Sequence, residues 1–187
     1  MKKTNRYKKS ITELQTDMDR VIGFVERYFT KTSISLGVWG VVISALLQEP
    51  LYLKLSYLFE YYNKHFNTLS VVFFICTFLS LVVFSCGIVN FVLTLVAKAP
   101  VSKKDSRLFY ADIAENKSIS TFKRKIEQST EEQIRDDYIN QIYINSVLCR
   151  EKNKRYNKGV YFSSFGFICF IISSIVFHFL SLSDFNS

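Results

Sequence analysis

A run of 28 residues without a charged side chain, residues 69–96, constrains this chain more than any other feature. As a helix it would rise about 42 Å, at about 1.5 Å per residue, whereas the hydrocarbon core of a bilayer is about 30 Å thick. Elements in the core of a soluble protein rarely run so far without a polar residue. The segment therefore predicts a membrane-spanning helix that is long enough to tilt.

Two further apolar runs predict two more spans. Residues 160–180 contain no Asp, Glu, Lys or Arg over 21 positions, and residues 34–47 form a shorter run of 14. Small residues in and beside the shorter run share one helical face, because they are spaced by four, three and four positions: Ser33, Gly37, Gly40 and Ser44. Small residues let membrane helices approach closely, so we expect this face to pack against residues 69–96.

The distribution of basic residues predicts the topology. The chain has a net charge of +8, and its Lys and Arg residues number eight in residues 1–31 and 14 in residues 98–158, but only two in residues 48–68. The positive-inside rule then places the amino terminus and residues 98–158 in the cytoplasm, and three spans place the carboxyl terminus outside. Basic segments beside apolar spans favour the lipid bilayer as a partner over nucleic acid.

The sequence thus predicts an all-α membrane protein with four parts. Residues 1–32 form a cytoplasmic amphipathic helix, 33–97 a transmembrane hairpin with an aromatic external loop, 98–158 a cytoplasmic helical module, and 159–187 a third transmembrane helix with a short external tail. The first helix carries a heptad-like apolar seam: Ile11, Leu14, Met18, Val21, Val25 and Tyr28. This seam either packs on the soluble part of the protein or mediates self-association.

A long helix is expected from about residue 130 to the last span. Ser129 and Glu132 fit a capping box at its start, and Gly159 is its candidate hinge before the last span. The helix has an apolar stripe, Ile134, Tyr138, Ile142 and Cys149. It ends in a basic cluster that is typical of binding to anionic lipid at a membrane surface: Arg150, Lys152, Lys154, Arg155 and Lys158.

Polar positions also occur inside residues 69–96. Thr77, Ser80, Gly87, Asn90 and Thr94 fall close to one helical face. The amide of Asn90 is costly in lipid, so it should face a partner helix or a water path. The polar face of Gly87, Asn90 and Thr94 therefore either packs within the helix bundle or lines a pore in an assembled state.

Patterns that accompany catalysis are absent from the sequence. It has no phosphate-binding or dinucleotide-binding glycine motif, no metalloprotease helix and no nucleophile elbow. None of its four cysteines forms a C-x-x-C pair. We therefore expect no enzyme activity, no catalytic residue, no metal site and no cofactor.

Three stretches carry a resemblance to a known family: TKTSISLGVWGVVISALL at 30–47, SRLFYADIA at 106–114 and QIYINSVLCREKNKRY at 141–156. In this order, and with the long span between the first two, the chain resembles the transmembrane effectors of the Pycsar antiphage systems. Tyr110 and Ala111 stand where the family has a glycine-containing form of the second stretch.

The resemblance implies a multi-pass protein of the bacterial inner membrane. A partner cyclase would make a cyclic nucleotide, a cyclic pyrimidine mononucleotide by this resemblance. The effector, as a homo-oligomer, would respond by impairing membrane integrity and causing growth arrest or cell death. The alternatives are a membrane scaffold or assembly protein, and a small channel subunit without a nucleotide ligand.

A cyclic nucleotide needs a cation for its phosphate and a ring to stack on its base. Arg107, Phe109 and Tyr110 supply these groups next to one another, and Lys103 and Lys104 are close in sequence. These five residues are the candidate ligand-binding residues. Alternatively, Leu108, Phe109 and Tyr110 simply pack the loop against the cytoplasmic helices.

Overall fold

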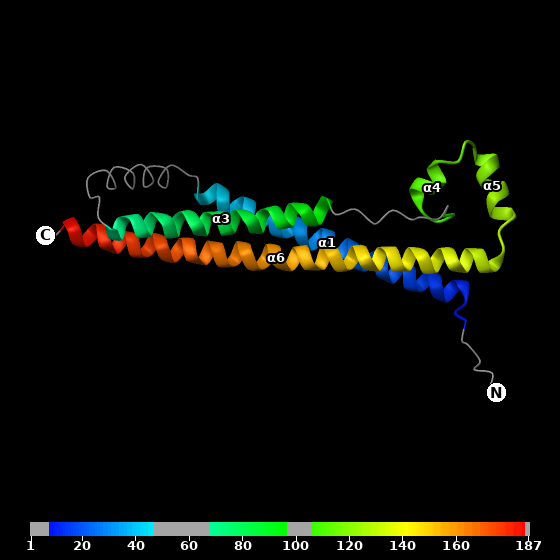
Figure 1. The fold of residues 1–187 in the computed structure, drawn as a ribbon, viewed down its shortest axis with the longest axis horizontal. Helices are drawn as coiled ribbons and strands as arrows, with labels where there is room; N and C mark the ends of the chain where they lie inside the picture. Colours follow the sequence, from blue (N-terminus) through cyan, green and yellow to red (C-terminus); the bar gives the residue numbers. More distant parts are fainter. Residues whose placement is uncertain (1–7, 47–67, 97–105, 186–187) are drawn as a thin grey trace, which may run out of the picture. The chain divides into compact units, whose positions relative to one another are not determined.

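The computed structural model describes residues 8–46, 68–96 and 106–185. Every regular element in these ranges is an α-helix: α1 (Ile11–Leu46), α3 (Thr68–Val96), α4 (Tyr110–Ala114), α5 (Ile119–Glu127) and α6 (Glu131–Phe185) (Figure 1). The predicted all-α class is confirmed. The chain divides into two compact units, a first unit of residues 1–28 with 97–152 and a second unit of residues 29–96 with 153–187.

Within the described residues, two helices are long and apolar enough to cross a membrane. One is residues 71–96 of α3, with a mean hydropathy of 2.6, and the other lies within residues 131–176 of α6, with a mean hydropathy of 1.9. The apolar end of α1 is not among them, so a third span at residues 34–47 stays a prediction. The predicted aromatic loop and Leu47 lie outside the described residues.

Two helices are longer than expected. α1 joins the predicted amphipathic helix and the first apolar run into one helix of 36 residues, because no proline precedes Pro50. A capping box that the sequence interpretation missed begins it: the Glu13 amide donates to Ser10 Oγ (3.2 Å), and the Ser10 amide donates to Glu13 Oε2 (2.7 Å). α6 runs through Gly159 for 55 residues, so the structure has no break at the candidate hinge.

In the first unit, α1 and α6 begin side by side. Lys8 forms an ion pair with Glu132 (3.6 Å), and Arg135 Nε donates to the carbonyl of Lys9 (3.2 Å). Leu14 is buried, and the other positions of the α1 seam are half-buried. Packing within the first unit is therefore favoured over self-association through the seam.

The buried face of α6 differs from the predicted one. Ile134, Tyr138, Ile142 and Cys149 are only half-buried, whereas the positions of α6 that are buried in this unit are Asp137, Gln141, Ile144 and Lys152. Apolar periodicity could not find this face, because three of its four residues are polar or charged.

The predicted capping box at the start of α6 is wrong by one residue. The Gln133 amide donates to Thr130 Oγ1 (3.3 Å), and the Thr130 amide donates to Gln133 Oε1 (3.1 Å). Both Ser129 with Glu132 and Thr130 with Gln133 fit the sequence pattern. The Ser129 hydroxyl is used elsewhere, since it donates to the carbonyl of Lys125 (2.6 Å) and thereby closes α5.

In the second unit, α3 and α6 pack antiparallel along one seam. The ring of Phe91 lies against Gly159, Gly87 lies against Ser163, Gly166 lies against the backbone of Phe84 and Ser80, and the hydroxyls of Thr77 and Ser173 are hydrogen-bonded at 2.6 Å. Small residues thus occupy the points where the two helix backbones come closest. This pairing lets the two backbones approach closely, as small residues do in membrane helix pairs.

The third helix of this unit packs through an aromatic cluster. Trp39 of α1 lies edge-on to Phe84 of α3 and Phe167 of α6, with ring centroids 5.2 and 5.3 Å apart. The small-residue face of α1 does not take part: Ser33, Gly37, Gly40 and Ser44 are exposed, and a Cβ atom added at either glycine would meet nothing within 4 Å. The expectation that this face packs against residues 69–96 is therefore wrong.

Candidate functional site

The candidate site of the first unit is built on a buried serine. Ser106 is fully buried, and its hydroxyl accepts hydrogen bonds from the amides of Leu108 and Phe109, both at 3.1 Å. Gln141 Nε2 donates to the same oxygen at 3.3 Å. The Ser106 amide donates to Asp112 Oδ2 (2.7 Å) within α4. These bonds fix residues 106–109 as a turn that leads into α4.

Arg107, the central residue predicted to bind a ligand, is hydrogen-bonded to side chains of α6. Its backbone amide donates to Oδ2 of the buried Asp137 at 2.6 Å. Its guanidinium donates to Ser129 Oγ through Nε and to Gln133 Oε1 through Nη2, the latter at 3.4 Å. The three α6 residues of this cluster, Gln133, Asp137 and Gln141, follow one another at four-residue intervals and so share one face of the helix.

The charges of this cluster are arranged unequally. The carboxylate of Asp137 accepts a hydrogen bond from the backbone amide of Arg107, whereas the guanidinium of Arg107 donates only to neutral oxygens. In the part of the chain that the structure describes, no carboxylate forms an ion pair with Arg107. The cluster therefore presents a half-buried, positively charged group whose geometry is fixed by neighbours.

The other predicted ligand residues are placed only in part. Phe109 is half-buried at the end of the turn, and Tyr110 begins α4, but the side chain of Tyr110 lies outside the described part of the chain. Lys103 and Lys104 also lie outside the described residues. The structure therefore brings Arg107 together with Ser129, Gln133 and Asp137, three residues that sequence reasoning missed. The sequence signal that could have indicated them is the four-residue spacing of polar residues on α6, at Gln133, Asp137 and Gln141.

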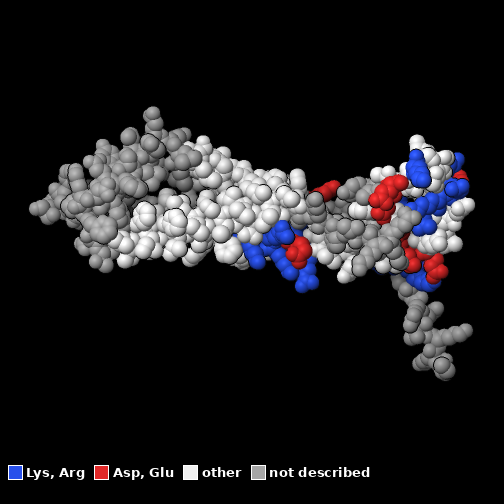
Figure 2. Space-filling view, turned by 45° about the horizontal axis from the view of Figure 1, so that its top comes forward, with Lys and Arg blue, Asp and Glu red and all other residues white. Residues whose placement is uncertain are grey.

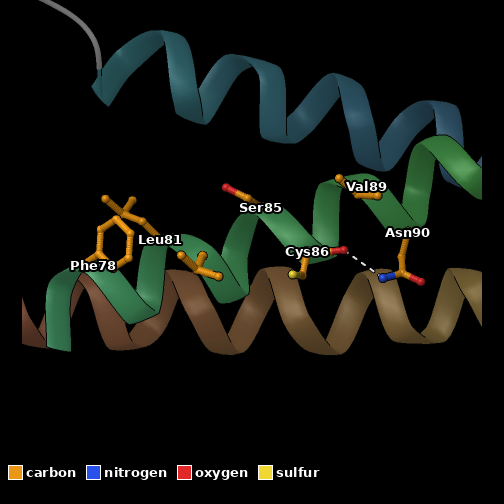
Figure 3. Close-up of a pocket in the computed structure, with 7 residues that line it drawn as sticks. Phe78, Leu81, Ser85, Cys86, Val89 and Asn90 are labelled. Atoms are coloured by element: carbon orange, nitrogen blue, oxygen red, sulfur yellow. Dashed lines mark hydrogen bonds between the residues drawn. The ribbon is translucent and has the colours of Figure 1, made fainter. Parts of the chain in front are cut away.

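The predicted polar face of α3 divides into two environments. Gly87 and Thr94 are buried in the seam, as is Ser80, so these positions pack within the bundle. Asn90 is half-buried, and its Nδ2 donates to the carbonyl of Cys86 at 2.8 Å. Figure 3 shows this bond at one end of a shallow groove on α3 that is lined by Phe78, Leu81, Val82, Ser85, Cys86, Val89 and Asn90. Gly87 and Thr94 thus lie in the seam and Asn90 lies at the end of this groove, and the lining of a pore in an assembled state stays a prediction.

The predicted basic cluster is not one surface. Arg150, Lys154 and Lys158 are exposed and Arg155 is half-buried, but Lys152 is only 4% exposed. Figure 2 shows that Lys and Arg side chains lie beside, and not within, a long stretch of surface that has no charged residue. Nη1 of Arg155 donates to the carbonyl of Leu93 (3.2 Å), in the last turn of α3.

The described residues offer no metal-binding group of three His, Cys, Asp or Glu side chains. Cys149 lies in the first unit, and burial raises the pKa of its thiol above the usual range. A thiol with a raised pKa is a poor nucleophile at neutral pH. Cys149 is therefore a weak candidate for a nucleophile.

Comparison with known proteins identifies the family. No solved structure matches the chain. The Pycsar effector protein GmPycTM of Gulbenkiania mobilis is 29% identical over 183 residues, which cover 87% of this chain and 90% of that protein. The model of the Pycsar effector protein domain matches residues 13–179, which include all five described helices except their outermost ends. This match and the two apolar helices indicate a membrane location, and the chain belongs to the Pycsar effector family.

Proposed function

We propose that this Pycsar effector binds a cyclic pyrimidine mononucleotide at Arg107 and then impairs the integrity of the bacterial inner membrane, which stops growth of the infected cell. The observation that carries the proposal is the guanidinium of Arg107, which Ser129 and Gln133 hold in place without neutralising its charge. A fixed guanidinium can donate two parallel hydrogen bonds to a phosphate, and such charge-assisted bonds are the strongest that a side chain makes. A partner cyclase would supply the ligand.

The proposed site is connected to the membrane through α6. The same helix that carries Gln133, Asp137 and Gln141 continues, without a break, into the span that packs on α3. A ligand can shift the arrangement of the spans only by its difference in affinity for two arrangements. A helix continuous from the site to the span is a direct way to convert that difference into a change of packing.

The proposed topology has three spans, with the amino terminus in the cytoplasm. Trp39 supports the first span, because its ring packs on Phe84 and Phe167 in the middle of the two apolar helices. Alkaline phosphatase fused after Ser187 should be active in the periplasm, whereas a fusion after Gln128 should be inactive. An inactive fusion at Ser187 would mean that the apolar end of α1 does not cross the membrane.

The ligand is tested by leakage of a dye from liposomes that contain the purified full chain. Cyclic UMP and cyclic CMP should each be compared with cyclic AMP and cyclic GMP. We expect leakage with a cyclic pyrimidine nucleotide and none without ligand. Leakage that does not depend on any nucleotide would favour a channel subunit, and no leakage at all would favour a scaffold or assembly protein.

Arg107→Ala should weaken nucleotide binding about ten- to hundredfold. This range follows from about 1.5–3 kcal/mol for a hydrogen bond to a charged group. Arg107→Lys should restore part of the affinity, because it keeps the charge but loses the fork. Arg124→Ala is the matched control, because Arg124 is exposed on α5 and its replacement removes the same charge from the same unit. Normal nucleotide binding by a folded Arg107→Ala protein would place the site elsewhere.

A further inference from the structure

One stripe of α6 changes from basic to apolar at a single point. Its positions are spaced by three or four residues and therefore share one face of the helix: Arg155, Lys158, Phe162, Phe165, Cys169 and Ile172. Lys158 is exposed and Arg155 is half-buried. The apolar residues that follow are also open, since Phe162, Phe165 and Ile172 are 42%, 63% and 56% exposed.

Among the described residues, no carboxylate pairs with either of the two cations of this stripe. Arg155 is held by a backbone carbonyl, that of Leu93, where the end of α3 lacks intrahelical partners. Lys158 makes no contact with a carboxylate among the described residues. Across residues 29–46, 68–96 and 153–176 the charged residues are all basic: Lys31, Lys154, Arg155 and Lys158.

We propose that this stripe binds an anionic phospholipid, with the phosphate at Arg155 and Lys158 and an acyl chain along Phe162 and Phe165. The proposal depends on the membrane location of α6. The order of groups along the stripe is the order in a phospholipid, a phosphate followed by a hydrocarbon chain. Half of a hydrocarbon core is about 15 Å thick, or about ten helical residues, so a chain that begins at the level of Lys158 passes both phenylalanines.

A neighbouring residue supports the same depth. Tyr161 is 75% exposed, and it follows Lys158 by three residues and precedes Phe162 by one. Tyrosine rings prefer the interface between headgroups and hydrocarbon. The level of residues 155–161 is therefore chemically suited to lipid headgroups, and the residues after it are suited to acyl chains.

The charge of the stripe also favours a lipid over a second copy of the chain as its binding partner. Two copies in the same membrane have the same orientation, so their basic ends would meet at the same depth. Like charges placed opposite each other are unfavourable. An anionic headgroup instead neutralises Arg155 and Lys158, and each basic residue near an anionic surface contributes about 1 kcal/mol.

The test measures lipid selectivity of the full chain in vesicles of mixed phosphatidylglycerol and phosphatidylcholine. Electron paramagnetic resonance of spin-labelled lipids gives the ratio of the two association constants at the protein surface. Lys158→Gln should lower the preference for phosphatidylglycerol about fivefold, which corresponds to the loss of one basic residue. Lys158→Arg should keep it. Lys117→Gln is the matched control, because it removes the same charge from an exposed position of the first unit.

Lys158 suits this test because no described contact ties it to the fold, so its replacement should leave the melting temperature unchanged. The proposal is overturned if Lys158→Gln keeps the wild-type preference, or if Lys117→Gln lowers it equally. It is also overturned if inorganic phosphate at 50 mM removes the preference in full while sodium chloride of equal ionic strength does not, since the site would then bind free phosphate. Dimerisation that increases in Lys158→Gln without a change in lipid preference would assign the stripe to a second copy.

Discussion

Gly87→Ala is expected to destabilise the second unit strongly, although alanine is the better helix former. A Cβ atom at this position would lie 2.3 Å from the backbone nitrogen of Ser163 and 2.7 Å from its Cα. Backbone atoms cannot rotate away, so α3 and α6 must separate and lose contacts along the whole seam. Overpacking of this kind costs about 1–3 kcal/mol or more. Gly166→Ala should behave in the same way, because its Cβ would lie 2.4 Å from the Phe84 nitrogen.

The matched controls lie in the same unit. Gly37→Ala and Gly40→Ala add the same methyl group to α1, where nothing lies within 4 Å. They should be neutral or stabilising, since alanine is favoured over glycine in a helix by about 0.5–1 kcal/mol. Unfolding of the detergent-solubilised protein should be followed by circular dichroism. The stability should fall in Gly87→Ala and Gly166→Ala, and it should stay equal or rise in Gly37→Ala and Gly40→Ala. Equal stability of Gly87→Ala and Gly40→Ala would contradict the packing of α3 on α6.

The glycines of α1 also show what the spacing of small residues can and cannot predict. The spacing of Ser33, Gly37, Gly40 and Ser44 correctly identifies a helical face of small residues, but spacing does not identify the partner of a face. The close approach occurs instead at Gly87 of α3 and at Gly159 and Gly166 of α6. Their role depends on which residue of the other helix comes opposite, which is a property of the antiparallel register and not of either segment alone.

Long uncharged segments were predictable because the bilayer imposes a length. Residues 69–96 and 160–180 were assigned correctly to helices for this reason. The ends of the helices were less predictable, because two capping boxes compete for the start of α6. Thr130 forms the box instead of Ser129, whose hydroxyl is used by a local bond to the Lys125 carbonyl and by a tertiary bond from Arg107.

The candidate site was predictable only at its centre. Arg107 was predictable because two aromatic residues, Phe109 and Tyr110, follow it closely in an otherwise polar segment. Its partners come from positions 22, 26 and 30 residues later, Ser129, Gln133 and Asp137. Asp137 and Gln141 are buried polar residues, and an apolar pattern places such residues on the solvent side of a helix.

Ser106→Ala is expected to loosen the turn that holds Arg107. The mutation removes the acceptor of two backbone amides, those of Leu108 and Phe109, and of the Gln141 side chain, at a position that is fully buried. Each buried donor left without a partner costs about 1–3 kcal/mol. Hydrogen exchange should therefore show that the amides of residues 108 and 109 lose protection, and the melting temperature should fall.

Ser106→Ala should also weaken nucleotide binding, because the turn sets the direction from which the Arg107 amide meets Asp137. Ser146→Ala is the control, since Ser146 is exposed on α6 and the same hydroxyl is removed without leaving a described donor unpaired. It should leave exchange, melting and nucleotide-dependent leakage unchanged. Unaltered protection of residues 108 and 109 in Ser106→Ala would show that the turn is held by Asp112 and Asp137 alone, and the buried serine would then have no part in positioning Arg107.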